Sequence, residues 1–166
     1  EVSVKVTRNR TVIKNEKHTV YVAQSALEKK SGTKKKEVVL PGVIEAKNKK
    51  QFNGEWFLRK VKIDGEAFNA DDFREHILMG EISVKVENLA TFERRSKNSV
   101  YSMGYEIIGC YDGSLKLDNF AGDKLYMWPT SDGGIYCKIN LKEVFQLINL
   151  DVGMYFYKQE QISSEQ

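Results

Sequence analysis

Apolar residues alternate with polar ones along much of this chain, and this spacing constrains the fold more than any other feature. Successive side chains of a strand point to opposite faces, so a period of two predicts strands with one buried face. The clearest sets are Val2, Val4 and Val6; Ile82, Val84 and Val86; Tyr105 and Ile107; Leu115 and Leu117; and Met154 and Phe156. The expected fold is mainly β, with antiparallel sheets in a β-sandwich or barrel-like arrangement.

The segment 56–63 alternates in the same way, which predicts Phe57, Val61 and Ile63 on one face, opposite Trp56 and Leu58. Tight turns should separate the strands, because Asp and Gly tolerate the positive φ that short hairpins require. The turn sequences are Asp64-Gly65, Asp112-Gly113 and Asp132-Gly133-Gly134. Gly104 and Gly109, within strand-like sequence, are typical of a bulge or a close backbone approach.

Two short helices, at residues 69–79 and 141–148, are expected to interrupt the strands. Asn69 and Asn140 are good N-cap residues, and Glu143 follows Asn140 at the spacing of a capping box. The apolar residues that follow each cap lie at helical spacing. Core packing is the favoured interpretation of both apolar stripes.

Length and composition predict one globular domain over residues 1–166, since the chain is 41% hydrophobic and 30% charged. Two basic loops, 29–36 and 47–54, and a polar tail, 160–166, are expected to be irregular. No apolar run approaches the roughly 20 residues that span a bilayer, and no signal peptide is visible. We therefore expect no membrane association and a location in the cytoplasm or in a virion.

The modest net charge of +3 hides an uneven distribution. Residues 1–50 carry 13 Lys/Arg against 5 Asp/Glu, whereas residues 51–166 carry 13 against 18. Such a chain can bind an external polyanion, or can dock the basic region of one copy on the acidic region of another. The sequence leaves both interpretations open.

Nucleic-acid binding is one of these two hypotheses. Its candidate phosphate contacts are Lys34, Lys35, Lys36, Lys47, Lys49 and Lys50. Phe52 and Trp56 are the nearest rings on which bases could stack, with Arg59 and Lys60 close behind them. A solvated loop or a protein contact surface is the competing interpretation of the lysines, and a core position is the competing interpretation of the two rings.

Catalytic signatures are sparse. Glu45-Ala46-Lys47 has the E-x-K spacing of metal-dependent nucleases, in which the carboxylate holds Mg²⁺ and the lysine orients water. Glu37 is the only nearby acid that could complete such a site, so a solvated strand end is favoured. The two histidines, His18 and His76, are interpreted as structural.

The two cysteines, Cys110 and Cys137, form no CxxC motif, which favours buried reduced thiols and leaves a disulfide as the alternative. No known nucleotide-binding, hydrolase or zinc-protease motif occurs in the chain. We therefore predict a non-enzymatic protein without a metal or cofactor.

Two local segments carry a family resemblance. Residues 38–45 read VVLPGVIE and residues 105–117 read YEIIGCYDGSLKL. Both segments resemble phage tail tube proteins and the related Hcp-type tube proteins of contractile secretion systems. The resemblance implies a β-rich subunit with one or two short helices and no active site, which stacks as rings. It implies that the partners are other copies of the chain, in a ring or tube, or companion structural proteins.

The leading hypothesis from the sequence is therefore a structural protein that self-assembles, as a phage or virus tail-tube or ring subunit. A nucleic-acid-binding protein that uses the basic loops is the first alternative. A metal-dependent nuclease built on Glu45 and Lys47 is the second.

Overall fold

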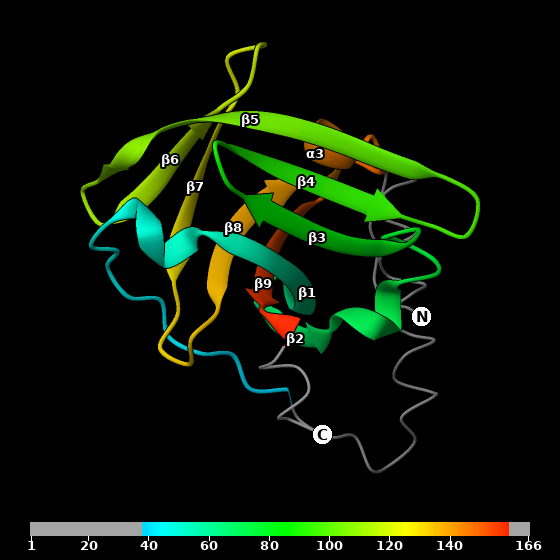
Figure 1. Ribbon diagram of the computed structural model, residues 1–166. Coiled ribbons are helices and arrows are strands. Elements are labelled where there is room, and N and C mark those ends of the chain that lie inside the picture. Colours follow the sequence, from blue (N-terminus) through cyan, green and yellow to red (C-terminus); the bar gives the residue numbers. More distant parts are fainter. Residues whose placement is uncertain (1–37, 160–166) are drawn as a thin grey trace.

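A computed structural model describes residues 38–159 of the chain. Nine strands dominate this part: β1 (Gly54–Ile63), β2 (Glu66–Asn69), β3 (Glu81–Val86), β4 (Leu89–Arg95), β5 (Val100–Tyr111), β6 (Ser114–Asp118), β7 (Lys124–Pro129), β8 (Ile135–Asn140) and β9 (Asp151–Tyr157). One α-helix, α3 (Leu141–Phe145), and two 3₁₀ turns, η1 (Lys49–Phe52) and η2 (Ala70–Phe73), accompany them. The mainly β prediction is confirmed (Figure 1).

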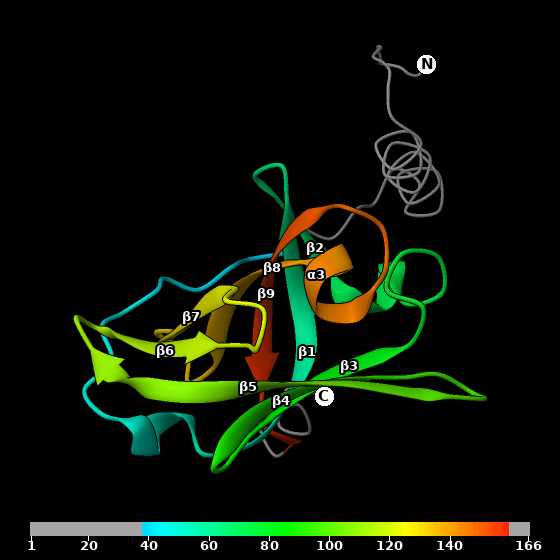
Figure 2. The ribbon, with the colours of Figure 1, turned by 90° about the horizontal axis from the view of Figure 1, so that it is seen from above.

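The strands form a closed antiparallel barrel. The order is β1-β3-β4-β5-β6-β7-β8-β9, and β9 pairs with β1 to complete the circle, while β2 extends β1 as a hairpin. Figure 2 shows the strands encircling the core, and α3 packs against β4, β5 and β8. Side chains fill the interior of an eight-stranded barrel, and Phe92, Met127 and Phe156 are fully buried there. The barrel therefore encloses a packed apolar core.

The predicted alternation holds for most strands. Ile82, Val84 and Val86 of β3 and Leu115 and Leu117 of β6 all point into the barrel and are buried. The turns at 64–65 and 112–113 have the expected positive φ at both residues of each pair. The register of β5 shifts between residues 107 and 109, which is the bulge that the glycines predict.

The prediction of which β1 side chains share one face is wrong. A bulge between Leu58 and Lys60 inserts one residue, so the inward face runs through Trp56 and Leu58 before it continues at Val61 and Ile63. Phe57, expected to share the face of Val61, points outward instead. A one-residue insertion exchanges the two faces of a strand, and period-two spacing alone does not reveal it.

The helix expected at 69–79 is also wrong. A 3₁₀ turn covers Ala70–Phe73, and Asn69 makes no side-chain capping bond. The chain then leaves through Met79 (φ 56) and Gly80 (φ 143), both of which have left-handed backbone conformations. Phe73 and Ile77 are buried, as the apolar spacing predicts.

The second helix is real but shorter than expected. Asn140 caps α3 by accepting from the backbone N–H groups of Lys142 and Glu143, at 3.0 and 3.1 Å. Gln146 ends the helix in a left-handed conformation (φ 57), so the predicted end at residue 148 is wrong. None of the helical segments among residues 38–159 has the length and apolar character that crossing a membrane requires.

The predicted strand at residues 2–6, the basic loop 29–36, His18, Glu37 and the tail 160–166 lie outside the described residues.

Candidate ligand-binding face

Three aromatic rings form a continuous row on the outer face of β7 and β8, and the last of them packs against a buried tyrosine of β9 that is only 3% exposed. Tyr126 and Trp128 of β7 lie with their ring centroids 6.2 Å apart, and Trp128 lies 6.1 Å from Tyr136 of β8. Tyr136 lies 4.8 Å from Tyr155 of β9. The strand pairs Trp128–Tyr136 and Tyr136–Tyr155 are directly opposed in the sheet, which places the rings side by side.

Lysines border the aromatic row. Lys116 of β6 pairs with Tyr126 of β7. Lys138 of β8 and Lys62 of β1 pair with Gly153 of β9 from its two sides. Lys60 of β1 pairs with the buried Tyr155, and its Nζ donates to the carbonyl of Val39 at 3.1 Å. We call this surface the aromatic–lysine face; it consists of Tyr126, Trp128, Tyr136, Lys60, Lys62, Lys116 and Lys138.

Gly153 gives the face its flatness. Its backbone lies directly beneath the Tyr136 ring, so a Cβ at this position would lie 2.9 Å from Cε1 and 3.0 Å from the hydroxyl of Tyr136. Because glycine has no side chain, the ring can lie across β9 rather than stand away from the sheet. Burial raises the pKa values of Tyr136 and Tyr155 above the usual 10, and neither hydroxyl carries negative charge at neutral pH.

The outward positions of this half of the barrel are predominantly basic. From β6 to β9 and along β1, they carry the cations Lys60, Lys62, Lys116, Lys124 and Lys138 and the anions Glu55, Asp118 and Asp151. One lysine is partly neutralised, because Lys124 Nζ lies 3.9 Å from Asp118. The outward positions of β3 and β4 instead carry Glu81, Glu93, Lys85 and Arg95, and no aromatic ring. Positive charge and aromatic rings therefore coincide on one side.

Lys116 is held between two tyrosine rings. Its Nζ donates to the Tyr111 carbonyl at 2.7 Å and to Ser114 Oγ at 2.8 Å. The same atom lies 4.4 Å from the ring centroid of Tyr111 and 5.4 Å from that of Tyr126. Both rings are exposed, at 47% for Tyr111 and 39% for Tyr126. The cation thus joins the end of β5 to the aromatic row.

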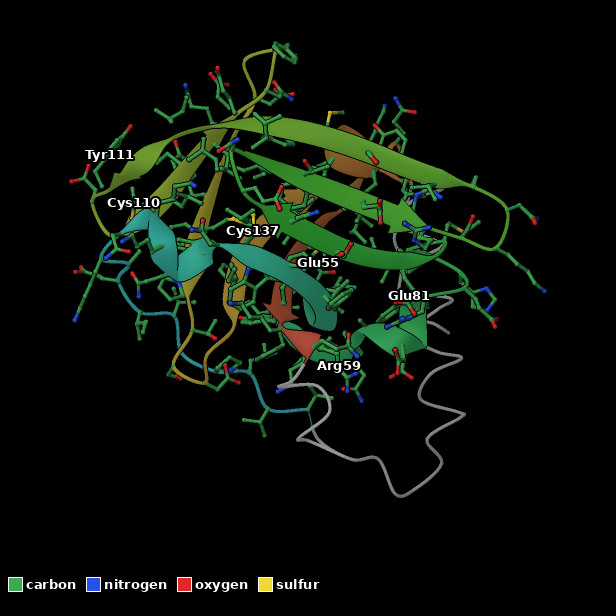
Figure 3. The ribbon with its side chains drawn as sticks, viewed as in Figure 1. Glu55, Arg59, Glu81, Cys110, Tyr111 and Cys137 are labelled. Carbon is green, nitrogen blue, oxygen red and sulfur yellow. The ribbon has the colours of Figure 1, made fainter. Side chains whose placement is uncertain are left out.

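The predicted basic loop 47–54 adjoins this corner of the barrel. Ala46 N–H donates to the carbonyl of Gly113 in the β5–β6 turn, and η1 follows directly. Figure 3 shows Tyr111 at this end of the barrel, far from Glu81 at the opposite end. Lys47 and Lys50 are exposed and Lys49 is half-buried. Lys34, Lys35 and Lys36 lie outside the described residues.

The rings that the sequence paired with this loop are in the core. Phe52 is fully buried, and Trp56 is 4% exposed with its indole N–H donating to the Phe52 carbonyl at 2.9 Å. Neither ring can stack on a base, so the competing core interpretation is the right one. The outward rings Tyr126, Trp128 and Tyr136 were missed, although the alternation of Tyr126 and Trp128 with Leu125 and Met127 was visible in the sequence.

The nuclease arrangement finds no support in the described residues. Glu45 and Lys47 are both exposed, and Glu45 packs along Gly113 of the β5–β6 turn. Residues 38–159 contain no group of three or more His, Cys, Asp or Glu side chains that could hold a metal ion. Glu37, the proposed second acid, lies outside this range.

His76 lies at the margin of an open cavity of about 590 Å³ between η2 and the β4–β5 hairpin. Charges in this cavity neutralise one another, since Arg74 forms ion pairs with both Asp71 and Glu81. The mixture of acids and bases selects no class of ligand.

The two cysteines are free thiols, as favoured from their spacing. Cys137 is fully buried inside the barrel, and this burial raises its pKa far above the usual range. Cys110 is half-buried at the end of β5. A buried, neutral thiol is a packing residue rather than a nucleophile.

Comparison of the chain with protein-family models, with curated proteins and with solved structures gives no match.

Proposed function

We propose that this chain is a non-enzymatic binding protein whose aromatic–lysine face holds a single strand of nucleic acid. The observation that carries the proposal is the row of three outward rings, of which Tyr126 is exposed and Trp128 and Tyr136 are half-buried, with lysines of β6, β8 and β1 beside it. Proteins that bind single strands combine stacking rings with cations along the backbone path. Aromatic rings accept any base, so this surface favours binding with little sequence preference.

The lysines favour a nucleic acid over a neutral glycan. A sugar can also lie on an aromatic ring, but it offers no charge to Lys62 and Lys138. A phosphate backbone does, and its release of counterions makes the affinity fall with salt. The exposed Lys47 and Lys50 beside the β5–β6 turn extend the same positive surface.

The tube-subunit hypothesis has less support from the described geometry. Subunits that join their sheets need free strand edges, and barrel closure removes edges. In the described sheet only β2, a strand of four residues, has a neighbour on one side alone. Self-assembly thus remains a prediction that would rely on side-chain contacts or on residues outside 38–159.

A salt titration tests the proposed function. Fluorescence anisotropy of a labelled oligothymidine of about 15 nucleotides, within the range of known site sizes, should show binding near 50 mM salt. Each phosphate contact contributes about 0.7 to the slope of log K against log salt on a single strand. The double substitution Lys62→Gln and Lys138→Gln should therefore lower the slope by about 1.4. Lys85→Gln, on the opposite side of the barrel, is the matched control.

The contribution of the residues that precede the barrel must be distinguished from the contribution of the aromatic–lysine face. Substituting Lys34, Lys35 and Lys36 by glutamine tests whether this basic segment carries the binding instead. A slope that responds only to this triple substitution would contradict the proposal. An absence of binding at 50 mM salt would overturn it entirely.

A further inference from the structure

The loop between β6 and β7 holds a phenylalanine entirely in solvent. Phe120 is 105% exposed, the highest value among the large hydrophobic residues of the described chain. Burying a phenylalanine side chain stabilises a protein by about 1.5–3 kcal/mol, so this position forgoes a substantial contribution to folding. Figure 1 shows the loop standing above the barrel, beyond the ends of β6 and β7.

The loop is braced by its own hydrogen bonds. Asn119 Oδ1 accepts from the N–H groups of Ala121 at 2.9 Å and Asp123 at 2.8 Å. The backbone adds a bond from Asn119 N–H to the Asp123 carbonyl, at 3.0 Å, and one from Gly122 N–H to the Asn119 carbonyl, at 3.1 Å. These bonds fix the loop while leaving the ring of Phe120 without a packing surface of its own.

The position of the loop relates it to the aromatic–lysine face. Asp118 pairs with Lys124 immediately before the loop, and Lys116 pairs with Tyr126 two residues further along the strands. With a rise of about 3.4 Å per residue, the loop begins roughly 7 Å beyond the Lys116–Tyr126 pair. Phe120 therefore stands at the end of the row of rings, and Lys124 lies at the base of its loop.

We infer that Phe120 is the end contact of the aromatic–lysine face and stacks on a base of the bound single strand. The inference rests on the proposed function. A nucleic-acid strand that follows β7 from Trp128 past Tyr126 toward the β6–β7 loop reaches Lys124 and then Phe120. The braced loop presents the ring without a large ordering cost on binding, and the base covers an apolar surface that the fold leaves bare.

The test compares the full-length protein with Phe120→Ala and with Ile108→Ala. Ile108 is the matched control, because it is an apolar residue of β5 that is 50% exposed and carries no ring on which a base could stack. Loss of one stacking contact costs about 1–3 kcal/mol, which is about a 5- to 150-fold rise in Kd. Phe120→Ala should produce this rise for the labelled oligothymidine, and Ile108→Ala should not.

The salt slope separates stacking from charge. Phe120→Ala should leave the slope unchanged, because it removes no cation, whereas the lysine substitutions lower it. Phe120→Trp should restore the affinity, and its indole fluorescence should be quenched when the oligonucleotide binds. Melting temperatures should match the wild type, since the side chain touches no part of the core.

The outcomes distinguish the inference from the function on which it rests. If the wild type binds the oligonucleotide and Phe120→Ala binds equally well, the inference is wrong and the proposed function stands. If the wild type does not bind at all, both the inference and the proposed function are wrong. If Phe120→Ala abolishes self-association in analytical ultracentrifugation but leaves oligonucleotide binding intact, Phe120 is a protein contact and the inference is overturned.

Discussion

Replacing Gly153 by alanine should disturb the aromatic–lysine face while leaving the barrel folded. The backbone of Gly153 has no left-handed φ, so alanine fits its conformation. The added Cβ would lie 2.9 Å from Cε1 of Tyr136 and 3.4 Å from the Cβ of Lys62. Ordinary contacts begin at 3.4 Å, so the Tyr136 ring must move by about half an ångström or tilt away from β9. Gly104→Ala is the matched control, because a Cβ at that strand position meets no atom within 4 Å.

The effect on stability is expected to be small. Alanine in place of glycine stabilises a compatible position by about 0.4–1 kcal/mol through the unfolded chain. Forcing Tyr136 off its rotamer costs about 0.5–1.5 kcal/mol, so Gly153→Ala should change the free energy of unfolding by less than about 1 kcal/mol. Gly104→Ala should show the full gain. Urea denaturation, followed by tryptophan fluorescence, measures both values.

The effect on binding should be larger. Tilting Tyr136 displaces the ring at the end of the row beside Trp128, and loss of about 1.4 kcal/mol of stacking corresponds to a tenfold rise in Kd. Anisotropy titrations with the oligothymidine should show this rise for Gly153→Ala and an unchanged Kd for Gly104→Ala. Equal affinities for the two variants would refute the reasoning, because the flat Tyr136 ring would then have no contact with the ligand.

Three further substitutions test the barrel itself. Asn140→Ala removes the cap of α3 and should cost about 1–2 kcal/mol, which lowers Tm by about 2–8 °C; calorimetry measures it. Gly80→Ala would place a Cβ 2.6 Å from the Arg95 carbonyl oxygen at φ +143, and urea denaturation should show a loss of at least about 2 kcal/mol. Burial raises the pKa of Tyr105 from 10.0 to about 12, so the folded state keeps a proton that the unfolded chain releases. Stability should therefore be unaffected by this group below pH 10 and fall as the pH rises toward 12; Tyr105→Phe should remove that part of the fall.

The strand positions were predictable because one face of each strand must fill the barrel. Ile82, Val84 and Val86 are buried on one face, and the lysine and serine between them face outward, so the period of two is unbroken. In β1 the bulge between Leu58 and Lys60 breaks the period. A bulge is set by pairing with β9, which lies far away in the sequence, so local spacing placed Phe57 on the wrong face.

The helix predictions show how far a local signal reaches. Asn140 caps a run of apolar residues, and a helix forms there. The left-handed backbone conformation of Gln146 then ends the helix. Asn69 offers the same cap residue, but the chain must turn quickly to return Gly80 to the backbone of Arg95. Tertiary contacts therefore override the propensity for a longer helix.

The candidate site could not be assembled from the sequence alone, because its residues come from separate strands. Lys62, Lys116 and Lys138 become neighbours of the aromatic row only through the register of β6 to β9 with β1. Tyr126 and Trp128 look like ordinary strand residues in the sequence. The local pairing of basic residues with Phe52 and Trp56 was attractive and misleading, since both rings are inside the barrel.

Closure of the barrel by its first and last strands has a consequence for biosynthesis. Phe57 of β1 pairs with Tyr157 of β9, a hundred positions later in the chain. At about 5–20 residues per second, β1 waits roughly 5–20 s for this partner to be synthesised. During that interval one side of β1 is an open edge that can pair with another chain. A chain that ends before Asp151 would lack β9 and leave β1 and β8 each with one unpaired edge, and such fragments should aggregate.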